Sequence, residues 1–137
     1  MLKPDGMVVC VHRDWETIAL NGSNKTLINK VIYEYANFLQ SGWMDSCDGW
    51  IGRRLWGHFH RTELFDGTID CYSKLETDYV PGQRGWSYVH NMDAFVGGSG
   101  FLTQVEYGEL LDDVAATAAR GEYLFSAPFY IYKGRKR

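Results

Sequence analysis

The sequence predicts a fold between α/β and α+β, in which a small mixed three-stranded sheet packs with about four helices. The strands are predicted at about 7–12, 68–78 and 123–133, with the last strand central and antiparallel. An unbroken apolar run, a stretch of strict alternation and a stretch that is apolar on both faces predict these strands. The segments between them repeat apolar residues at helical spacing. The chain, 1–137, is predicted to be a single domain because its length suits one hydrophobic core.

The first strand follows a turn at Asp5-Gly6, where glycine can adopt a positive φ without steric penalty. Five apolar residues, Met7 to Val11, then follow without a polar interruption. A short apolar run between polar boundaries is typical of a strand buried on both faces inside an α/β sheet. We therefore expect helices on both sides of this strand.

A long amphipathic helix is predicted at about 24–40, where apolar residues recur at steps of three and four. Either Ser23 or Asn24 can cap its N-terminus with a side-chain oxygen. The helix is expected to end at Ser41-Gly42, because glycine suits the left-handed position after a helix.

A second helix is predicted at about 50–62, with Asp48 as its N-cap. This helix carries His58 and His60, a pair that could suggest a metal site. Residues two apart on a helix point about 200° away from each other, so these imidazoles cannot share one ion. We therefore expect no metal here.

The second half contains a weaker helical pattern at about 86–96 and a glycine-rich loop at 97–100. No strand precedes this loop, so it is read as a turn between helices rather than as a phosphate-binding segment. Thr103 and Glu106 form a T-x-x-E capping box, which predicts a helix that stops at Gly121.

The two later strands have different patterns. Residues 68–78 alternate with charged side chains, which suits an edge of the sheet. Residues 123–133 are apolar or aromatic on both faces, which favours a central strand. Pro128 cannot donate a ladder hydrogen bond, so we expect a bulge there.

Composition argues against several classes of protein. A net charge of −3 disfavours nucleic acid as a partner, and the basic tail 133–137 is expected to be solvated. No apolar run approaches the roughly 20 residues that span a membrane, and no apolar signal segment follows Met1. Three cysteines outside any CxxC pattern indicate reduced thiols and a cytoplasmic protein. We find no nucleophile elbow, metal-ligand spacing or carboxylate pair of an independent hydrolase or oxidoreductase.

Several stretches together carry a family resemblance. They are L-K-P-D-G at 2–6, R-D-W-E-T at 13–17, G-W-I-G-R-R-L at 49–55, and the closing stretch 123–136. This order resembles the late half of class I S-adenosylmethionine-dependent methyltransferases, whose L-K-P-G-G turn precedes strand five. Among its subgroups, the chain looks most like small-molecule methyltransferases of the type labelled arsenite- or ubiquinone-related. The resemblance covers nearly all of the chain.

The resemblance implies half of a methyltransferase-like Rossmann fold. Residues 7–12, 68–78 and 123–133 correspond to strands five, six and seven, and strand seven lies between the others, antiparallel to both. The family binds S-adenosylmethionine through a glycine-rich loop and an acidic residue in its first half. No residue here corresponds to either, so no cofactor-binding residue and no cofactor are expected for this chain alone. S-adenosylmethionine is expected only if a partner supplies the missing half.

The same resemblance implies substrate-binding residues just beyond strand five, namely His12, Arg13, Asp14 and Trp15. Ligands of open α/β sheets bind outside the carboxyl ends of strands, which favours the same positions. Trp15 could stack on a flat substrate and Asp14 could orient a donor. Alternatively, Arg13 and Asp14 cap the strand end while Trp15 packs on a helix. No catalytic residue is assigned.

Without a fourth strand, the outer edge of the first strand is left open beside apolar side chains. We therefore expect a homodimer, formed through the Met7–Val11 strand edge or by helices that cover the open sheet. The first functional hypothesis is a methyltransferase-derived module, non-catalytic alone, that binds a small aromatic or apolar ligand. The second is the substrate-side half of a split or truncated methyltransferase that acts on a small molecule. A gene fragment without an independent role is the third.

Overall fold

Two compact units make up the structure, a computed structural model that describes residues 2–38 and 48–137. The first unit contains the described residues of Met1–Thr17, Ala36–Ser73 and Ala127–Arg137. The second contains Ile18–Tyr35 and Lys74–Ser126. The two units are thus interleaved along the sequence. That 1–137 forms a single domain stays a prediction.

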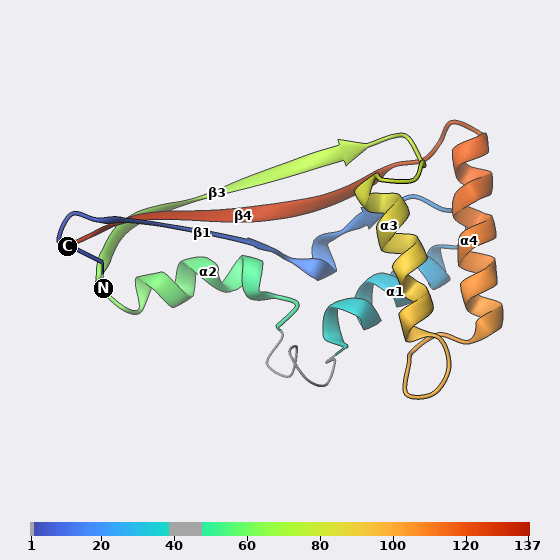
Figure 1. The fold of residues 1–137 in the computed structure, drawn as a ribbon, viewed down its shortest axis with the longest axis horizontal. Helices are drawn as coiled ribbons and strands as arrows, with labels where there is room; N and C mark the ends of the chain where they lie inside the picture. Colours follow the sequence, from blue (N-terminus) through green and yellow to red (C-terminus); the bar gives the residue numbers. More distant parts are fainter. Residues whose placement is uncertain (1, 39–47) are drawn as a thin grey trace. The chain divides into compact units, whose positions relative to one another are not determined.

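An antiparallel sheet runs through the described residues, and β4 is its central strand. Its strands are β1 (Met7–Arg13), β2 (Ala19–Leu20), β3 (Phe65–Glu76) and β4 (Phe125–Lys136). Both β1 and β3 pair with β4 and lie on either side of it (Figure 1). The mixed α/β class and the central last strand are confirmed, and β3 is an edge strand of the described sheet as predicted.

The strand count differs from the prediction, because the described part of the chain has four strands rather than three. The additional strand, β2, pairs with the first residues of β4. At two residues it is too short to produce an alternating pattern, so periodicity could not identify it.

Pro128 lies where β4 changes its neighbour, between residues 129–135 that pair with β1 and residues 125–126 that pair with β2. The pairing with β1 is uniform, so the ladder contains no bulge over that span. Even-numbered residues of β4 direct their N–H groups toward β1, as Lys136 N does toward Gly6 O at 2.9 Å. Pro128 therefore lacks its donor just beyond the end of the β1 ladder, and the predicted bulge is unnecessary.

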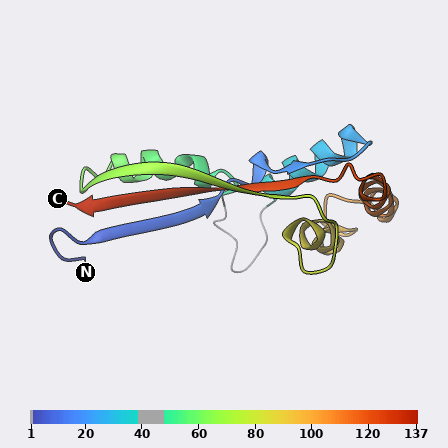
Figure 2. The ribbon, with the colours of Figure 1, turned by 90° about the horizontal axis from the view of Figure 1, so that it is seen from above.

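The expectation that β1 is buried on both faces is wrong. Met7, Val9 and Val11 are 57%, 58% and 50% exposed. The opposite face of β1 packs against α2 (Ile51–His60), which lies along one side of the sheet in Figure 2. An unbroken apolar run indicates burial on both faces only if a second layer covers the other side, and within this unit α2 supplies one layer.

Tyr132 of β4 is the centre of the packing between the sheet and α2. Its ring stacks on Phe59 with centroids 4.1 Å apart, and Trp56 lies at 6.4 Å. A Cβ on Gly67 would lie 2.5 Å from Tyr132 Cζ, and one on Gly134 would lie 2.7 Å from its Cε1. The two glycines therefore leave the space that this ring occupies.

The predicted helices are present. They are α1 (Lys25–Asn37), α2, α3 (Arg84–His90) and α4 (Gln104–Ala119), together with the short 3-10 helices η1 (Trp15–Thr17) and η2 (Asn91–Phe95). The capping box of α4 is confirmed, because Thr103 Oγ1 accepts from Glu106 N at 3.1 Å and Glu106 Oε2 accepts from Thr103 N at 2.9 Å.

At the start of α1, Asn24 Oδ1 accepts a hydrogen bond from Leu27 N at 3.1 Å, which selects Asn24 over Ser23 as the cap. The helix ends at Asn37, before the predicted end at about residue 40, and the predicted stop at Ser41-Gly42 lies outside the described residues. The core of the second unit contains side chains with no exposed surface, Val31, Val89, Met92, Leu110 and Val114. No helix in the described ranges has the length and apolar character needed to cross a membrane.

Candidate functional site

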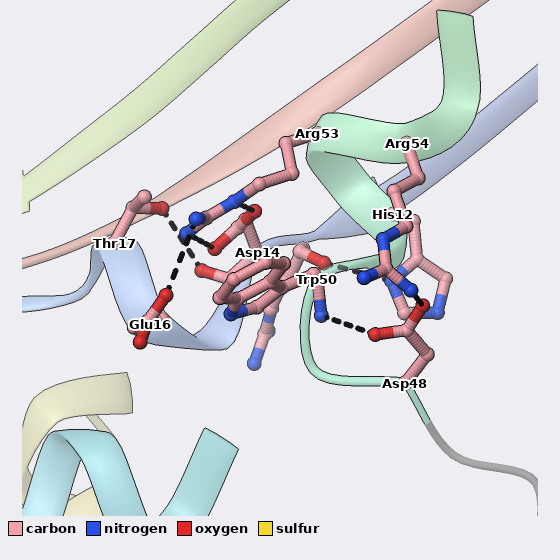
Figure 3. Close-up of polar contacts among 9 residues, drawn as sticks. His12, Asp14, Glu16, Thr17, Asp48, Trp50, Arg53 and Arg54 are labelled. Carbon is pink, nitrogen blue, oxygen red and sulfur yellow. Dashed lines mark hydrogen bonds and ion pairs between the residues drawn. The ribbon is translucent and has the colours of Figure 1, made fainter. Parts of the chain in front are cut away.

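The end of β1 meets the start of α2, and the predicted site residues His12 and Asp14 lie at this junction (Figure 3). Trp15 N donates to Gly49 O at 2.9 Å, which ties the residues after β1 to the segment before α2. A Cβ on Gly52 would lie 2.8 Å from Asp14 N, so α2 approaches the chain closely here. Three side chains next to this junction are charged or aromatic, namely Glu16, Trp50 and Arg53.

Asp14 has no exposed surface and forms a two-pronged ion pair with Arg53. Arg53 Nη2 donates to Asp14 Oδ1 at 2.6 Å, and Arg53 Nε donates to Asp14 Oδ2. Arg53 Nη1 also lies 3.2 Å from Glu16 Oε2. The hydrogen bond to Asp14 raises the pKa of Arg53 above its ordinary value, against the lowering effect of burial. One guanidinium thus bridges two carboxylates that follow β1.

The backbone of Asp14 is also engaged, because its carbonyl accepts from Thr17 N at 3.3 Å and from Thr17 Oγ1 at 3.0 Å. These bonds form the η1 turn directly after β1. Both carboxylate oxygens of Asp14 face Arg53, so its side chain and backbone together join β1, η1 and α2. This arrangement gives Asp14 a structural role at the junction.

The aromatic ring of Trp50 lies between two arginines. Arg53 Cζ is 4.6 Å from its centroid and Arg54 Cζ is 5.2 Å away. Asp48 binds two members of this stack, since its Oδ1 accepts from Trp50 N at 2.9 Å and its Oδ2 accepts from Arg54 Nη1 at 2.6 Å. The prediction that Asp48 is the N-cap is wrong, because Trp50 holds that position without a side-chain cap bond; Asp48 instead orders the turn two residues earlier.

The other predicted site residues lie beside this cluster. His12 Nδ1 is 2.8 Å from Arg13 O, which makes Nδ1 the donor. The guanidinium of Arg13 lies over Trp15 at 5.0 Å and over Phe129 at 4.7 Å. His12, Arg13, Asp14 and Trp15 thus lie together at the C-terminal end of β1, and their binding of a substrate stays a prediction.

Sequence analysis did not identify Arg53 as the partner of Asp14, although Arg53 lies within the stretch 49–55 that carries the family resemblance. The two residues are 39 positions apart, and a pairing at that separation has no periodicity. The signal available was a charged residue shortly after an apolar strand, together with an Arg-Arg pair in the first turn of a helix.

The two histidines of α2 contact other side chains. His58 Nδ1 accepts from Arg61 Nη2 at 3.0 Å, and the ring of His60 stacks on Trp56 at 5.5 Å. Within 2–38 and 48–137, no group of three or more potential metal ligands comes together.

A groove of about 450 Å³ opens on the second unit. Ile18, Leu20, Ile28 and Ile32 contribute apolar surface to it, and further lining residues are Ala19, Asn21, Asn29, Glu122 and Leu124. Asn21 fixes one wall, because its Nδ2 donates to Glu122 O at 2.7 Å. The groove can hold a small apolar molecule beside polar groups.

The outer edge of β1 is the second open feature. Because Gly6 O accepts from Lys136 N, the alternation of an antiparallel ladder turns the backbone groups of Met7, Val9 and Val11 away from β4. No strand among the described residues pairs with β1 on that side.

The two edges of the first unit's sheet differ in chemistry. Exposed β3 carries Asp66 and Asp70, which pair with Arg137 and Lys133. The segment Met7–Val11 of β1 contains no charge, proline or glycine. Proteins protect sheet edges with such residues, so β1 is the unprotected edge.

Comparisons with known proteins assign no family: no family model matches the sequence, and none of the curated proteins matches it.

Proposed function

We propose that this chain is a non-catalytic assembly module that acts as a homodimer and derives from a methyltransferase fold. The observation that carries the proposal is β1, an apolar strand at a sheet edge with half-exposed side chains on one face. Unpaired backbone groups beside apolar side chains form a template for another strand. A cytoplasmic location is part of the proposal, and Cys10 and Cys71 are free thiols.

The order of the strands supports the proposed origin. In the methyltransferase family, strand seven lies between strands five and six, antiparallel to both. The central position of β4 between β1 and β3 has the same order. No stretch of 1–137 resembles the glycine-rich loop and acidic residue that hold the cofactor in that family, so the proposal assigns these residues no cofactor of their own.

The test combines two measurements on one purified sample. Sedimentation equilibrium is expected to give the mass of a dimer at micromolar concentration. Isothermal titration with S-adenosylmethionine and S-adenosylhomocysteine is expected to show no binding. A stable monomer contradicts the assembly role, and micromolar binding of either compound contradicts the non-catalytic role.

A split methyltransferase is the second candidate, because the open edge of β1 is where the family's strand four would pair. In that case a chain that carries the glycine-rich half binds this one at β1. Titration with S-adenosylmethionine is then expected to show binding only after the two chains are mixed. Binding by the other chain alone, unchanged after mixing, contradicts this candidate.

The groove of the second unit is the proposed site for a small aromatic or apolar ligand. Indole serves as the probe, with chemical-shift changes in amide NMR spectra as the readout. Shifts are expected around Ile32 and Asn29, and I32E is expected to abolish them by placing a charge against the apolar wall. Shifts spread evenly over both units contradict a specific site.

A further inference from the structure

We infer that two copies pair edge to edge, with β1 antiparallel to the partner's β1 and with the two Val9 residues opposite each other. This inference rests on the proposed homodimer and deepens it, because it names the surface, the partner strand and the register. The sheet of the first unit then continues into that of the partner.

The backbone of β1 supplies the hydrogen-bonding groups for this pairing. The even-numbered residues of β1 form the backbone hydrogen bonds to β4. The odd-numbered residues Met7, Val9 and Val11 direct their N–H and C=O groups away from β4. An antiparallel neighbour must place residues of the same class opposite each other. This restricts a symmetric pairing to registers that match odd-numbered residues with odd-numbered residues.

The ends of the open segment fix which of these registers is available. After Val11, the carbonyl of Arg13 accepts from His12 Nδ1, and Gly52 of α2 lies against the same peptide group. Before Met7, Asp5 has a φ of 59° and turns the chain out of the strand direction. The segment that can pair is therefore Met7–Val11, and its centre is Val9.

A twofold axis at Val9 opposes Met7 with the partner's Val11, and Val8 with the partner's Cys10. The exposed side chains of Met7, Val9 and Val11 then meet their own kind along the seam, where cross-strand β-branched and apolar pairs are favourable. The β3 edge offers no equivalent apolar segment, because Asp66, Asp70 and Lys74 place charges along it.

A disulfide across the seam tests the register. In a hydrogen-bonded antiparallel pair the Cα atoms are about 5.5 Å apart, which suits a disulfide. The variant V9C is made with C10S, C47S and C71S, so that its thiol is the only one in the chain. Copper-phenanthroline with dissolved oxygen accepts two electrons and two protons from each thiol pair. Rapid formation of a covalent dimer is expected.

Two matched controls use native cysteines as the only thiol. The variant with C47S and C71S retains only Cys10, which lies opposite the partner's Val8 in this register. This variant is expected to remain monomeric on denaturing gels. The variant with C10S and C47S retains only Cys71, which is exposed on β3. It is expected to remain monomeric as well. Val9 is already solvent-exposed, so V9C is expected to fold as the wild type does.

The outcomes separate this inference from the homodimer itself. A dimeric mass with cross-linking at Cys10 and not in V9C overturns the register, and a dimeric mass with cross-linking in neither overturns edge pairing. Cross-linking at Cys71 assigns the contact to β3, which also overturns it. A monomeric mass with no cross-linking overturns the homodimer together with the inference.

A charge on the seam gives an independent readout. V9K is expected to raise the dimer dissociation constant by roughly tenfold or more, because two lysines face each other across the axis. V105K on α4 adds the same charge at an exposed valine of the second unit and is expected to leave it unchanged. Equal effects of the two variants, each with a native circular dichroism spectrum, overturn the inference.

Discussion

At the scale of single residues, the ion pair of Asp14 and Arg53 joins a buried charge to a partly exposed one. Asp14 is fully buried, whereas the Arg53 side chain is 35% exposed. Removing one member of a buried pair leaves an unpaired charge, which is strongly destabilising. The contribution of this pair to stability is therefore best measured against an exposed pair on the same helix.

The variants R53M and R54M make that comparison. R53M is expected to lower the free energy of unfolding by about 3 kcal/mol, the lower end for broken buried pairs, because Arg53 is partly exposed. R54M removes a pair with Asp48 in which both side chains are at least one-third exposed, and a loss below about 1 kcal/mol is expected. Urea unfolding measures both, and equal losses contradict the structural role of Asp14.

Glu106 gives the second residue-scale prediction, which concerns acid. Hydrogen bonds from Lys30 and from Thr103 lower the pKa of Glu106 from 4.5 to about 2. Because the pKa is lower in the folded chain, the stabilisation is complete above pH 4.5 and is lost as the pH falls toward 2. E106Q is therefore expected to be less stable than the wild type at pH 6, and the difference is expected to shrink toward pH 2. Thermal unfolding across this range measures it, and a constant difference contradicts the prediction.

These two residues also show what sequence can predict at this scale. The capping box of Thr103 and Glu106 was predictable, because its partners are three residues apart and follow a local pattern. The bridge from Arg53 to Asp14 and Glu16 was not, since it depends on how α2 approaches the end of β1. The sequence placed the predicted substrate residues next to one another. It did not predict that Asp14 is buried and paired with Arg53.

At the scale of elements, two helical glycines have opposite environments. A Cβ on Gly85 of α3 would lie 2.6 Å from Phe125 Cβ, whereas one on Gly108 of α4 would meet nothing within 4 Å. G85A is expected to destabilise by about 1–3 kcal/mol through overpacking. G108A is expected to stabilise by up to about 1 kcal/mol, because alanine favours helix. Chemical denaturation of both variants tests the pair, and a gain for G85A contradicts the packing described.

Elements with a repeated pattern were predicted, and elements without one were not. Helix spacing identified α1 and α4, and apolar residues on both faces identified β4 as central. The two-residue β2 carries no pattern. The one-sided exposure of β1 depends on which layers cover the sheet, and an apolar run contains no information on that.

At the scale of the whole molecule, the proposed dimer has a thermodynamic consequence. If association stabilises the folded chain, the midpoint of thermal unfolding rises with protein concentration. Over a roughly hundred-fold range, a rise of several degrees is expected for the wild type, and V9K is expected to unfold at a lower midpoint at each concentration because its dimer is weaker. Calorimetry at increasing concentration measures this, and a midpoint that is independent of concentration contradicts the proposed dimer.

The sequence predicted the central position of the last strand and one open edge, because the sheet order follows from the character of each strand. It did not predict two units that alternate along the chain. Such alternation arises because β3 and β4 each continue from one unit into the other, and the pattern of a strand does not reveal where its packing partners change.

The ring of Tyr132 over Gly67 and Gly134 also predicts how relatives of this chain vary. The three positions form one steric unit: a side chain at 67 or 134 requires a smaller residue at 132. In an alignment of homologues, they are expected to change together or not at all, although positions 67 and 132 lie 65 apart in the sequence. Covariation at these positions would then serve as a signature for finding distant relatives by sequence.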